Sequence, residues 1–190
     1  GTLGHISNLY RHSAGEELSE RLCELTCMEA VFFSNSGSEA NEAALKLARK
    51  HHATTGSPER QHFVALERGF HGRTFGSLSV TANAAYRTPF GEGLAAKFLE
   101  PDDIGALEAA LSEGPAAFIM EPIQGEGGVQ PLDADYVAAA RELCTQTGTV
   151  MIADEVQCGG GKPPRVEGGE RRGGGGGGGG VGRAEAEEVE

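Results

Sequence analysis

Apolar residues along this chain follow two alternating patterns, which together predict an α/β fold. Short continuous apolar runs indicate buried strands, and apolar residues three or four positions apart indicate helices. The expected strands are residues 30–33, 63–66, 97–99, 116–120 and 149–153, and the expected helices are 13–25, 38–51, 103–111 and 134–147. Short apolar strands separated by helices are typical of a largely parallel sheet covered on both faces.

Local signals suggest where several helices begin and end. Ser13 followed by Glu16 predicts a capping box at the first helix. Gly148 is expected to end the last helix. The helix over 38–51 is expected to bury one face, made of Ala40, Ala44, Leu47 and Ala48.

The composition changes abruptly at Gly159, where we place a domain boundary. Residues 159–190 contain 14 glycines, eight of them consecutive from Gly173 to Gly180. A segment with so few apolar side chains cannot offset its ordering entropy by burial, so we expect it to be disordered. We therefore predict a partial folded domain over 1–158 and a glycine-rich tail over 159–190 that does not belong to it.

Charge and hydropathy narrow the choice of partners and location. Sixteen basic and 28 acidic residues give a formal net charge of −12, which argues against a nucleic-acid partner. No run of 18 apolar residues predicts a membrane-spanning helix. The chain begins with Gly1, and we expect it to start partway into a longer protein. Its compartment, either the cytoplasm or the interior of a plastid or mitochondrion, is therefore not readable from a leader.

The cysteines predict neither a disulfide framework nor a metal site. The pair Cys23 and Cys27 shares a helix face, but no second pair of Cys or His stands at zinc-binding spacing. We expect small buried hydrophobic side chains in a reducing compartment at all four cysteines, Cys23, Cys27, Cys144 and Cys158.

Four polar segments follow expected strands, and parallel α/β sheets bind ligands beyond the carboxyl ends of their strands. The first, residues 34–42, leads into a helix whose free N–H groups and Ser38 hydroxyl can bind an anion. It lacks the Gly-Lys-Ser/Thr of a Walker A loop. By itself it fits a plain capped turn equally well.

The second segment, residues 69–74, places an aromatic ring between glycines. Phe70 can lie flat against a planar ligand, and Arg73 can bind a carboxylate with both arms of its guanidinium. His71 can compete with Phe70 for the stacking position. A core Phe, a surface Arg and a loop His also fit these residues.

The third segment, residues 121–128, carries Glu121 and Glu126 in a glycine-rich loop. Acids in such loops are mostly solvated. Glu126, however, stands among three glycines, and without bulky neighbours its side chain can reach into a site.

The fourth segment, residues 154–157, places Asp154 at the end of an apolar strand, where a buried carboxylate needs a cationic partner. A protonated pyridine nitrogen would be one, with an attraction of roughly 4 kcal/mol at 4 Å. Gln157 can hydrogen-bond a substituent of such a ring. Walker B acids and metal-binding Asp-Glu pairs share this pattern.

Together, the order and spacing of these segments resemble the class III, fold type I, pyridoxal-phosphate aminotransferases. The similarity runs from about Gly4 to Gly159. It is carried by HISNLY, FFSNSGSEANEAALKLARKH, GFHGRTFGSLSVT, YRTPFGEGL, EPIQGEGGV and DEVQCG. The Phe-His-Gly-Arg-Thr and Tyr-Arg-x-Pro-Phe stretches favour the branch that acts on N-acetylornithine over those that act on ornithine or 4-aminobutyrate.

The resemblance implies the large domain of that fold, a homodimer with active sites at the subunit interface, and pyridoxal 5'-phosphate as cofactor. Cofactor contacts are implied for Gly37 and Ser38 at the phosphate, Phe70 on the ring, Asp154 at the ring nitrogen, Gln157 near the ring oxygen, and His71 and Val156 beside them. Arg73 is implied at the substrate carboxylate. Glu126 matches a position that helps to switch between diamine-type substrates and glutamate.

The chain departs from the family pattern at its catalytic lysine, which forms the Schiff base and moves a proton. By resemblance, that lysine is expected beyond Asp154, past a further strand, in a segment that this chain lacks. We therefore assign no catalytic residue. The lysines present are expected on a helix face, in a strand and in the tail, at Lys46, Lys50, Lys97 and Lys162.

Two hypotheses follow. In the first, the chain is a fragment of an aminotransferase of arginine biosynthesis that moves the terminal amino group of N-acetylornithine to 2-oxoglutarate, giving glutamate. Ornithine, succinylornithine and 4-aminobutyrate remain alternative donors. In the second, the chain is catalytically inactive, and either binds the cofactor or pairs with intact subunits.

Overall fold

The computed structural model describes residues 7, 10–26 and 28–158 of the chain. The chain divides into two units, Gly1–Phe33 and Ser34–Glu190, and each is described by itself. The expected tail over 159–190, Lys162 and Cys27 lie outside the described residues.

The first unit contributes one helix, α1 (Ser13–Thr26). The predicted capping box is wrong, because Ser13 is already the first helical residue. The imidazole Nδ1 of His12 instead accepts a hydrogen bond from the N–H of Gly15, at 3.2 Å. The carboxylate of Glu16 pairs with Arg11 at 2.9 Å.

The strand expected over 30–33 is not formed. This segment has no ladder partner among the described residues, and the side chains of Phe32 and Phe33 are exposed. The apolar run gives the residues a tendency toward strand, but a strand also requires a neighbour that accepts and donates its backbone hydrogen bonds.

The second unit is built on a parallel sheet whose strand order is β2-β1-β3-β6. Every neighbouring pair is parallel, so the predicted α/β fold is confirmed. The two central strands are buried along their whole length, which explains why they are continuous apolar runs. The strands are β1 (Phe63–Leu66), β2 (Ala96–Leu99), β3 (Ala117–Met120) and β6 (Val150–Ala153).

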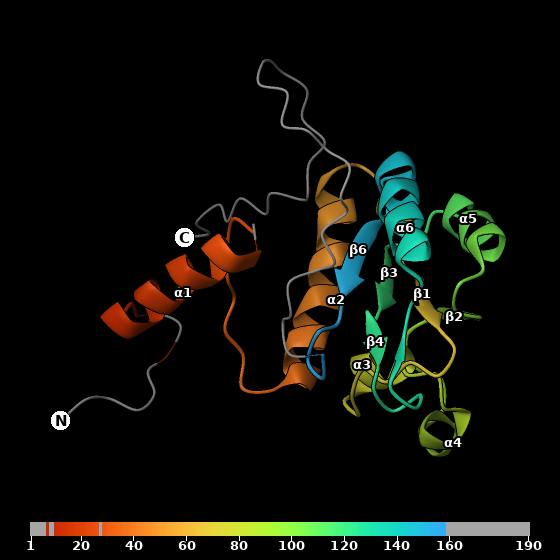
Figure 1. Cartoon of the computed structure of the whole chain (residues 1–190), viewed down its shortest axis with the longest axis horizontal. Helices are drawn as coiled ribbons and strands as arrows, with labels where there is room; N and C mark the ends of the chain where they lie inside the picture. Colours follow the sequence, from red (N-terminus) through yellow and green to blue (C-terminus); the bar gives the residue numbers. More distant parts are fainter. Residues whose placement is uncertain (1–6, 8–9, 27, 159–190) are drawn as a thin grey trace. The chain divides into compact units, whose positions relative to one another are not determined.

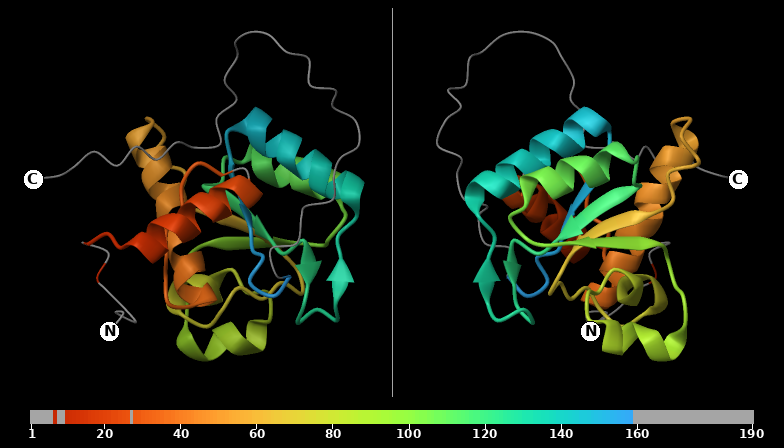
Figure 2. Two further views of the ribbon diagram at one scale, coloured as in Figure 1. Left: turned by 60° about the vertical axis from the view of Figure 1, so that its left-hand side comes forward. Right: turned by 90° about the vertical axis from the view of Figure 1, so that its right-hand side faces the viewer.

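Helices cover both faces of this sheet (Figures 1 and 2). Along β1 the side chains alternate between two core clusters. Val64 and Leu66 pack in the cluster with α5 and α6, and Phe63 and Ala65 pack in the cluster with α2. The three helices are α2 (Gly37–Thr54), α5 (Ile104–Ser112) and α6 (Ala134–Thr147).

The buried face of α2 is not the one that the sequence predicted. The helix buries Asn41, Leu45, Ala48 and His52. Of the expected face, only Ala48 is buried, and the side chain of Leu47 is 49% exposed. Alanine forms helix well and loses little when exposed, so its spacing indicates a helix but not the face that packs.

Other boundaries agree with the sequence. Asp103 caps α5 by accepting from the N–H of Ala106, and Gly148 ends α6 in the left-handed conformation at φ 67°. Cys144 is buried on α6, and burial raises the pKa of its thiol to about 11. Cys23 and Cys158 are only half-buried, so the prediction of full burial is wrong for them.

Shorter elements lie at the end of the sheet where the strands finish (Figure 1). They are α3 (Phe75–Ser79), α4 (Ala84–Arg87), the 3-10 helix η1 (Thr88–Phe90) and an antiparallel pair, β4 (Ile123–Gln124) and β5 (Gln130–Pro131). None of the described helices is long and apolar enough to cross a membrane.

The two leucines of α2 give a matched test of this packing. Leu45 is 1% exposed and Leu47 is 49% exposed. We expect Leu45→Ala to lower the free energy of unfolding by about 2–5 kcal/mol, because it leaves a cavity. Leu47→Ala should change it by less than about 1 kcal/mol. Urea unfolding followed by circular dichroism measures both, and equal losses would contradict the assigned face.

Candidate functional site

The four polar segments meet at one edge of the sheet. Three of them follow the carboxyl ends of β1, β3 and β6, and the fourth forms the start of α2. In Figure 1 the first turn of α2 lies at the same end of the sheet as the strand arrowheads. Parallel strands thus bring together segments that are far apart in the sequence.

Asp154 is at the centre of this edge, with a side chain that is 4% exposed. Its Oδ2 accepts hydrogen bonds from Nδ2 of Asn41 and Nδ1 of His71, both at 2.8 Å. Its Oδ1 accepts from the N–H of Val156 at 3.1 Å. A carboxylate has about four acceptor positions, so three donors leave Asp154 able to accept one more.

The donors keep Asp154 ionised in spite of its burial. Burial by itself would raise the pKa of the carboxyl, but the hydrogen bonds from His71 and Asn41 outweigh it and lower that pKa below the ordinary value. The sequence required a cationic partner for this carboxylate. Within the chain, the His71 imidazole supplies a hydrogen bond to this carboxylate. The other ring nitrogen of His71, Nε2, is buried without a hydrogen-bond partner among the described residues.

Glu121 is also buried at this edge, at 2% exposure. Its two oxygens accept from the backbone N–H groups of Phe70, at 2.8 Å, and Gly125, at 3.2 Å. Burial raises the pKa of this carboxyl, and the two hydrogen bonds offset only part of that rise. The expectation that acids of this loop are solvated is therefore wrong for Glu121. Its side chain joins the Phe70 loop to the glycine-rich loop.

The start of α2 is closely packed against two of the other segments. A Cβ added at Gly37 would lie 2.7 Å from both Cγ atoms of Val156. A Cβ at Gly72, whose φ is 122°, would collide with Oγ of Ser38. Only glycine allows this approach, and it leaves the Ser38 hydroxyl beside the free N–H groups of the first helical turn.

Phe70 and Glu126 line a common hollow of about 440 Å³. Arg73 is close by, with its guanidinium carbon 6.0 Å from the centre of the Phe70 ring and 4.3 Å from that of Tyr86. Gln157 is exposed and lies against Gly125. All nine residues expected from the sequence are therefore placed along this edge of the sheet.

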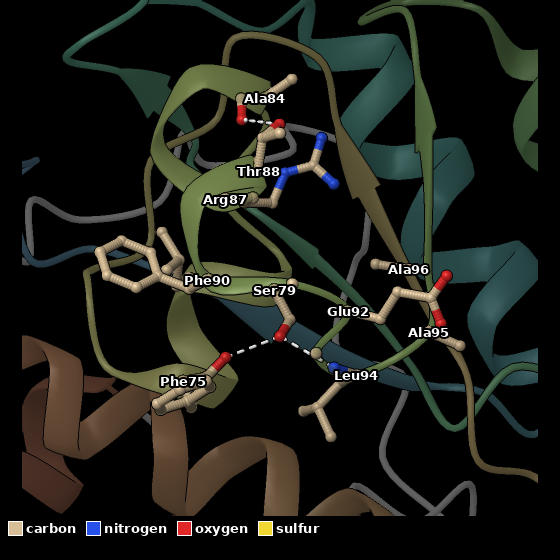
Figure 3. Close-up of a pocket in the computed structure, with 13 residues that line it drawn as sticks. Phe75, Ser79, Ala84, Arg87, Thr88, Phe90, Glu92, Leu94, Ala95 and Ala96 are labelled. Atoms are coloured by element: carbon tan, nitrogen blue, oxygen red, sulfur yellow. Dashed lines mark hydrogen bonds between the residues drawn. The ribbon is translucent and has the colours of Figure 1, made fainter.

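A second hollow, of about 600 Å³, contains none of those residues. Figure 3 shows it between the chain over 84–96 and Phe75, with Oγ of Ser79 bridging the carbonyl of Phe75 and the N–H of Leu94. The site residues expected from the sequence lie at the carboxyl ends of the strands and not in this hollow.

Sequence reasoning missed Asn41 and Tyr86. Asn41 stands three residues after Ser38, one helical turn along α2, and in line with the buried Leu45 and Ala48. A polar residue in an otherwise buried stripe was the available signal. Tyr86 stands in the Tyr-Arg-x-Pro-Phe stretch that carries part of the resemblance. Nothing local in that stretch indicated its contact with Arg73, because helix α3 separates the two residues along the chain.

The described lysines lie elsewhere. Lys46 and Lys50 are exposed on α2. Lys97 is on β2 and pairs with Glu113 at 2.6 Å. None of these three ammonium groups reaches the edge that carries Asp154.

Comparison with known proteins decides the family. The sequence profile of the aminotransferase class-III family matches residues 1–163. The chain belongs to this family. As a class III aminotransferase chain, it is 49% identical over 160 residues to acetylornithine aminotransferase of Methanosarcina mazei, an alignment that covers 83% of this chain and 39% of that protein.

Solved structures agree with this assignment. A Bacillus anthracis aminotransferase is 36% identical with a TM-score of 0.75, and the match covers 83% of this chain and 40% of the other. A pyridoxal-phosphate-bound amine transaminase from an uncultivated Pseudomonas species is 36% identical with a TM-score of 0.69, covering 77% and 39%. This class III chain therefore spans about two fifths of the length of the relatives it matches.

The lowered pKa of Asp154 makes the stability of this chain pH-dependent. Because the carboxyl is more acidic folded than unfolded, its stabilising effect is present above an unfolded pKa of about 4 and is lost as the pH falls through the folded pKa. We expect Asp154→Asn to cost about 1–3 kcal/mol at pH 7 and to flatten the loss of stability in acid. Urea titrations between pH 7 and 3 measure this.

Glu113→Gln is the matched control for that experiment. The hydrogen bond and charge of Lys97 lower the pKa of Glu113 as well, but this carboxylate is on the surface. Salt should screen the small effect of Glu113 on the free energy of unfolding. The effect of the buried Asp154 on that free energy should persist at high salt. An unchanged acid slope in Asp154→Asn would contradict the assignment.

Proposed function

We propose that this protein is an aminotransferase that uses pyridoxal 5'-phosphate to move the terminal amino group of N-acetylornithine to 2-oxoglutarate, a reaction of arginine biosynthesis. The observation that carries the proposal is the buried, ionised Asp154, with acceptor capacity for one more donor, beside the start of α2. Family membership supports the reaction class, and the name of the Methanosarcina relative supports the donor.

The residues at the carboxyl ends of the strands fit the cofactor in charge and in hydrogen-bonding capacity. When bound, the cofactor supplies a pyridinium ring that withdraws electrons from the substrate. Asp154 would hold the proton at the ring nitrogen, and His71 and Asn41 would keep that carboxylate charged and oriented. His71 thus acts on the cofactor through Asp154.

The remaining contacts to the cofactor and the substrate are assigned from where each residue lies at the carboxyl ends of the strands. Gly37 and Ser38 would bind the phosphate at the start of α2. Phe70 would cover one face of the ring, and Val156 and Gln157, just beyond Asp154, would border it. Arg73 would bind the donor carboxylate, and Glu126, which shares the hollow with Phe70, would distinguish diamine-type donors from glutamate.

The positions of the lysines favour a second candidate for the 190-residue chain itself. Because Lys46, Lys50 and Lys97 lie away from Asp154, the chain has the contacts to bind the cofactor but no described amine that could react with it. Such a chain would bind pyridoxal phosphate, or pair with a second subunit, without turnover. A homodimer and an organelle or cytoplasmic location remain expectations for the whole protein.

Cofactor binding can be tested without activity. We expect the protein to bind pyridoxal phosphate, and Asp154→Asn to weaken binding of both pyridoxal phosphate and pyridoxal. Ser38→Ala should weaken only pyridoxal phosphate, about tenfold, because pyridoxal lacks the phosphate. Equilibrium dialysis with absorbance detection measures this. Ser112→Ala, at an exposed position of α5, is the control. Equal effects of Ser38→Ala on the two ligands would contradict the assigned phosphate contact.

A second test separates the two candidates. We expect the purified 190-residue chain to show no transfer from N-acetylornithine to 2-oxoglutarate, and borohydride to trap no defined lysine adduct. If the native gene encodes the reacting lysine, the protein expressed from that gene should catalyse the transfer and should give a lysine adduct that borohydride traps. Sequencing the transcript across the codon for Gly159 establishes whether the gene encodes this lysine. Turnover by the 190-residue chain would overturn the second candidate. Preference for ornithine or 4-aminobutyrate in the full gene product would overturn the assigned donor.

A further inference from the structure

We propose that Tyr86 is a positioning residue for substrate binding: its ring holds the guanidinium of Arg73 so that the N–H groups stay free to bind the donor carboxylate. The proposal rests on the proposed function for the identity of the substrate. Tyr86 lies in the Tyr-Arg-x-Pro-Phe stretch, for which the sequence alone suggested no contact with Arg73.

The contact itself is geometric. The guanidinium carbon of Arg73 lies 4.3 Å from the centre of the Tyr86 ring, well within the range of cation–π attraction. Phe70 provides a second, more distant ring at 6.0 Å. Tyr86 is half-buried, whereas Arg73 is exposed, so the ring provides the fixed surface against which a long, flexible side chain is ordered.

The guanidinium of Arg73 lies over aromatic rings. Among the described residues, no hydrogen bond or ion pair involves Arg73. Glu126 lines the hollow with Phe70 and Tyr86 but does not pair with Arg73. A ring face attracts the guanidinium without occupying its N–H donors, so the planar fork remains available for a bidentate carboxylate.

Helix α4 is fixed in a way that supports this role. The Asn83 side chain caps it by accepting from the N–H of Ala85 at 3.0 Å. The next residue, Arg87, hydrogen-bonds the carbonyl of Ala82 at 3.2 Å and lies over the ring of Phe98 on β2, at 4.4 Å. Neighbouring residues of one short helix thus serve two purposes, with Arg87 joining it to the sheet and Tyr86 contacting Arg73.

The contact also predicts which substrates are affected. A residue that orders Arg73 matters only for a donor that carries the carboxylate bound by Arg73. It should not affect N-acetylputrescine, which is N-acetylornithine without that carboxylate. A residue that merely maintains the fold would affect both donors alike.

The test uses the protein expressed from its native gene. We expect Tyr86→Leu to raise KM for N-acetylornithine about fivefold, with kcat changed less than twofold and KM for N-acetylputrescine unchanged. Tyr86→Phe keeps the ring, so its KM for N-acetylornithine should equal that of the unmodified protein. In an Arg73→Lys background, which lacks the planar fork, Tyr86→Leu should have little further effect.

Phe90→Leu is the matched control. Phe90 is an exposed aromatic on the adjacent turn that lines the other hollow, and its loss should leave both KM values unchanged. The proposal is overturned if Tyr86→Phe is as impaired as Tyr86→Leu, if both donors lose affinity equally, or if Phe90→Leu gives the same rise.

A spectroscopic measurement separates this proposal from the proposed function. The Nε–H proton of Arg73, assigned by its loss in Arg73→Lys, should be shifted upfield by the ring current, and this shift should persist in Tyr86→Phe and disappear in Tyr86→Leu. If neither donor is turned over but the shift behaves in this way, the proposed substrate is wrong and the positioning contact stands. If the shift does not depend on the ring, the positioning role is wrong whatever the substrate.

Discussion

The arrangement of the segments at the carboxyl ends of the strands depends on one constraint, the buried charge of Asp154. An ionised carboxylate at 4% exposure would cost several kcal/mol without donors. Its side-chain donors come from Asn41 on α2 and from His71 in the loop after β1, which are 113 and 83 residues away in the sequence. Satisfying one charge therefore fixes the relative positions of a helix, a loop and a strand end.

Around that charge, close backbone contacts set the shape of the site. Gly37 and Gly72 allow Val156 and Ser38 to approach where any side chain would collide. Glu121 then joins the Phe70 loop to the glycine-rich loop through two backbone N–H groups. Contacts among the chain's own residues position the start of α2, the Phe70 loop and the Asp154 carboxylate, which is the preorganisation that the proposed cofactor site would require.

The sequence predicted those parts of the fold that local pattern determines. Strands β1 and β3 are buried on both faces, so they appear as uninterrupted apolar runs. Residues 30–33 have the same pattern but no neighbouring strand in the part of the chain that the structure describes, and no local signal reveals that. The residues of the candidate site likewise divide into those that local sequence indicated and those that it did not. Asp154 was recognisable at the end of its strand, whereas Asn41, Glu121 and Tyr86 acquire their roles from partners that only the folded chain brings near.

The two buried carboxylates of this edge show how donors, rather than burial, determine charge. Asp154 and Glu121 are similarly buried, yet the pKa of Asp154 is lowered and that of Glu121 is raised. Asp154 receives two side-chain donors, one of them an imidazole that can carry positive charge, and Glu121 receives only two neutral backbone N–H groups. As the pH falls, Glu121 is therefore protonated first. Each carboxylate oxygen of Glu121 accepts an N–H, so a proton on one of them competes with that hydrogen bond. The link between the two loops weakens while Asp154 still holds its charge.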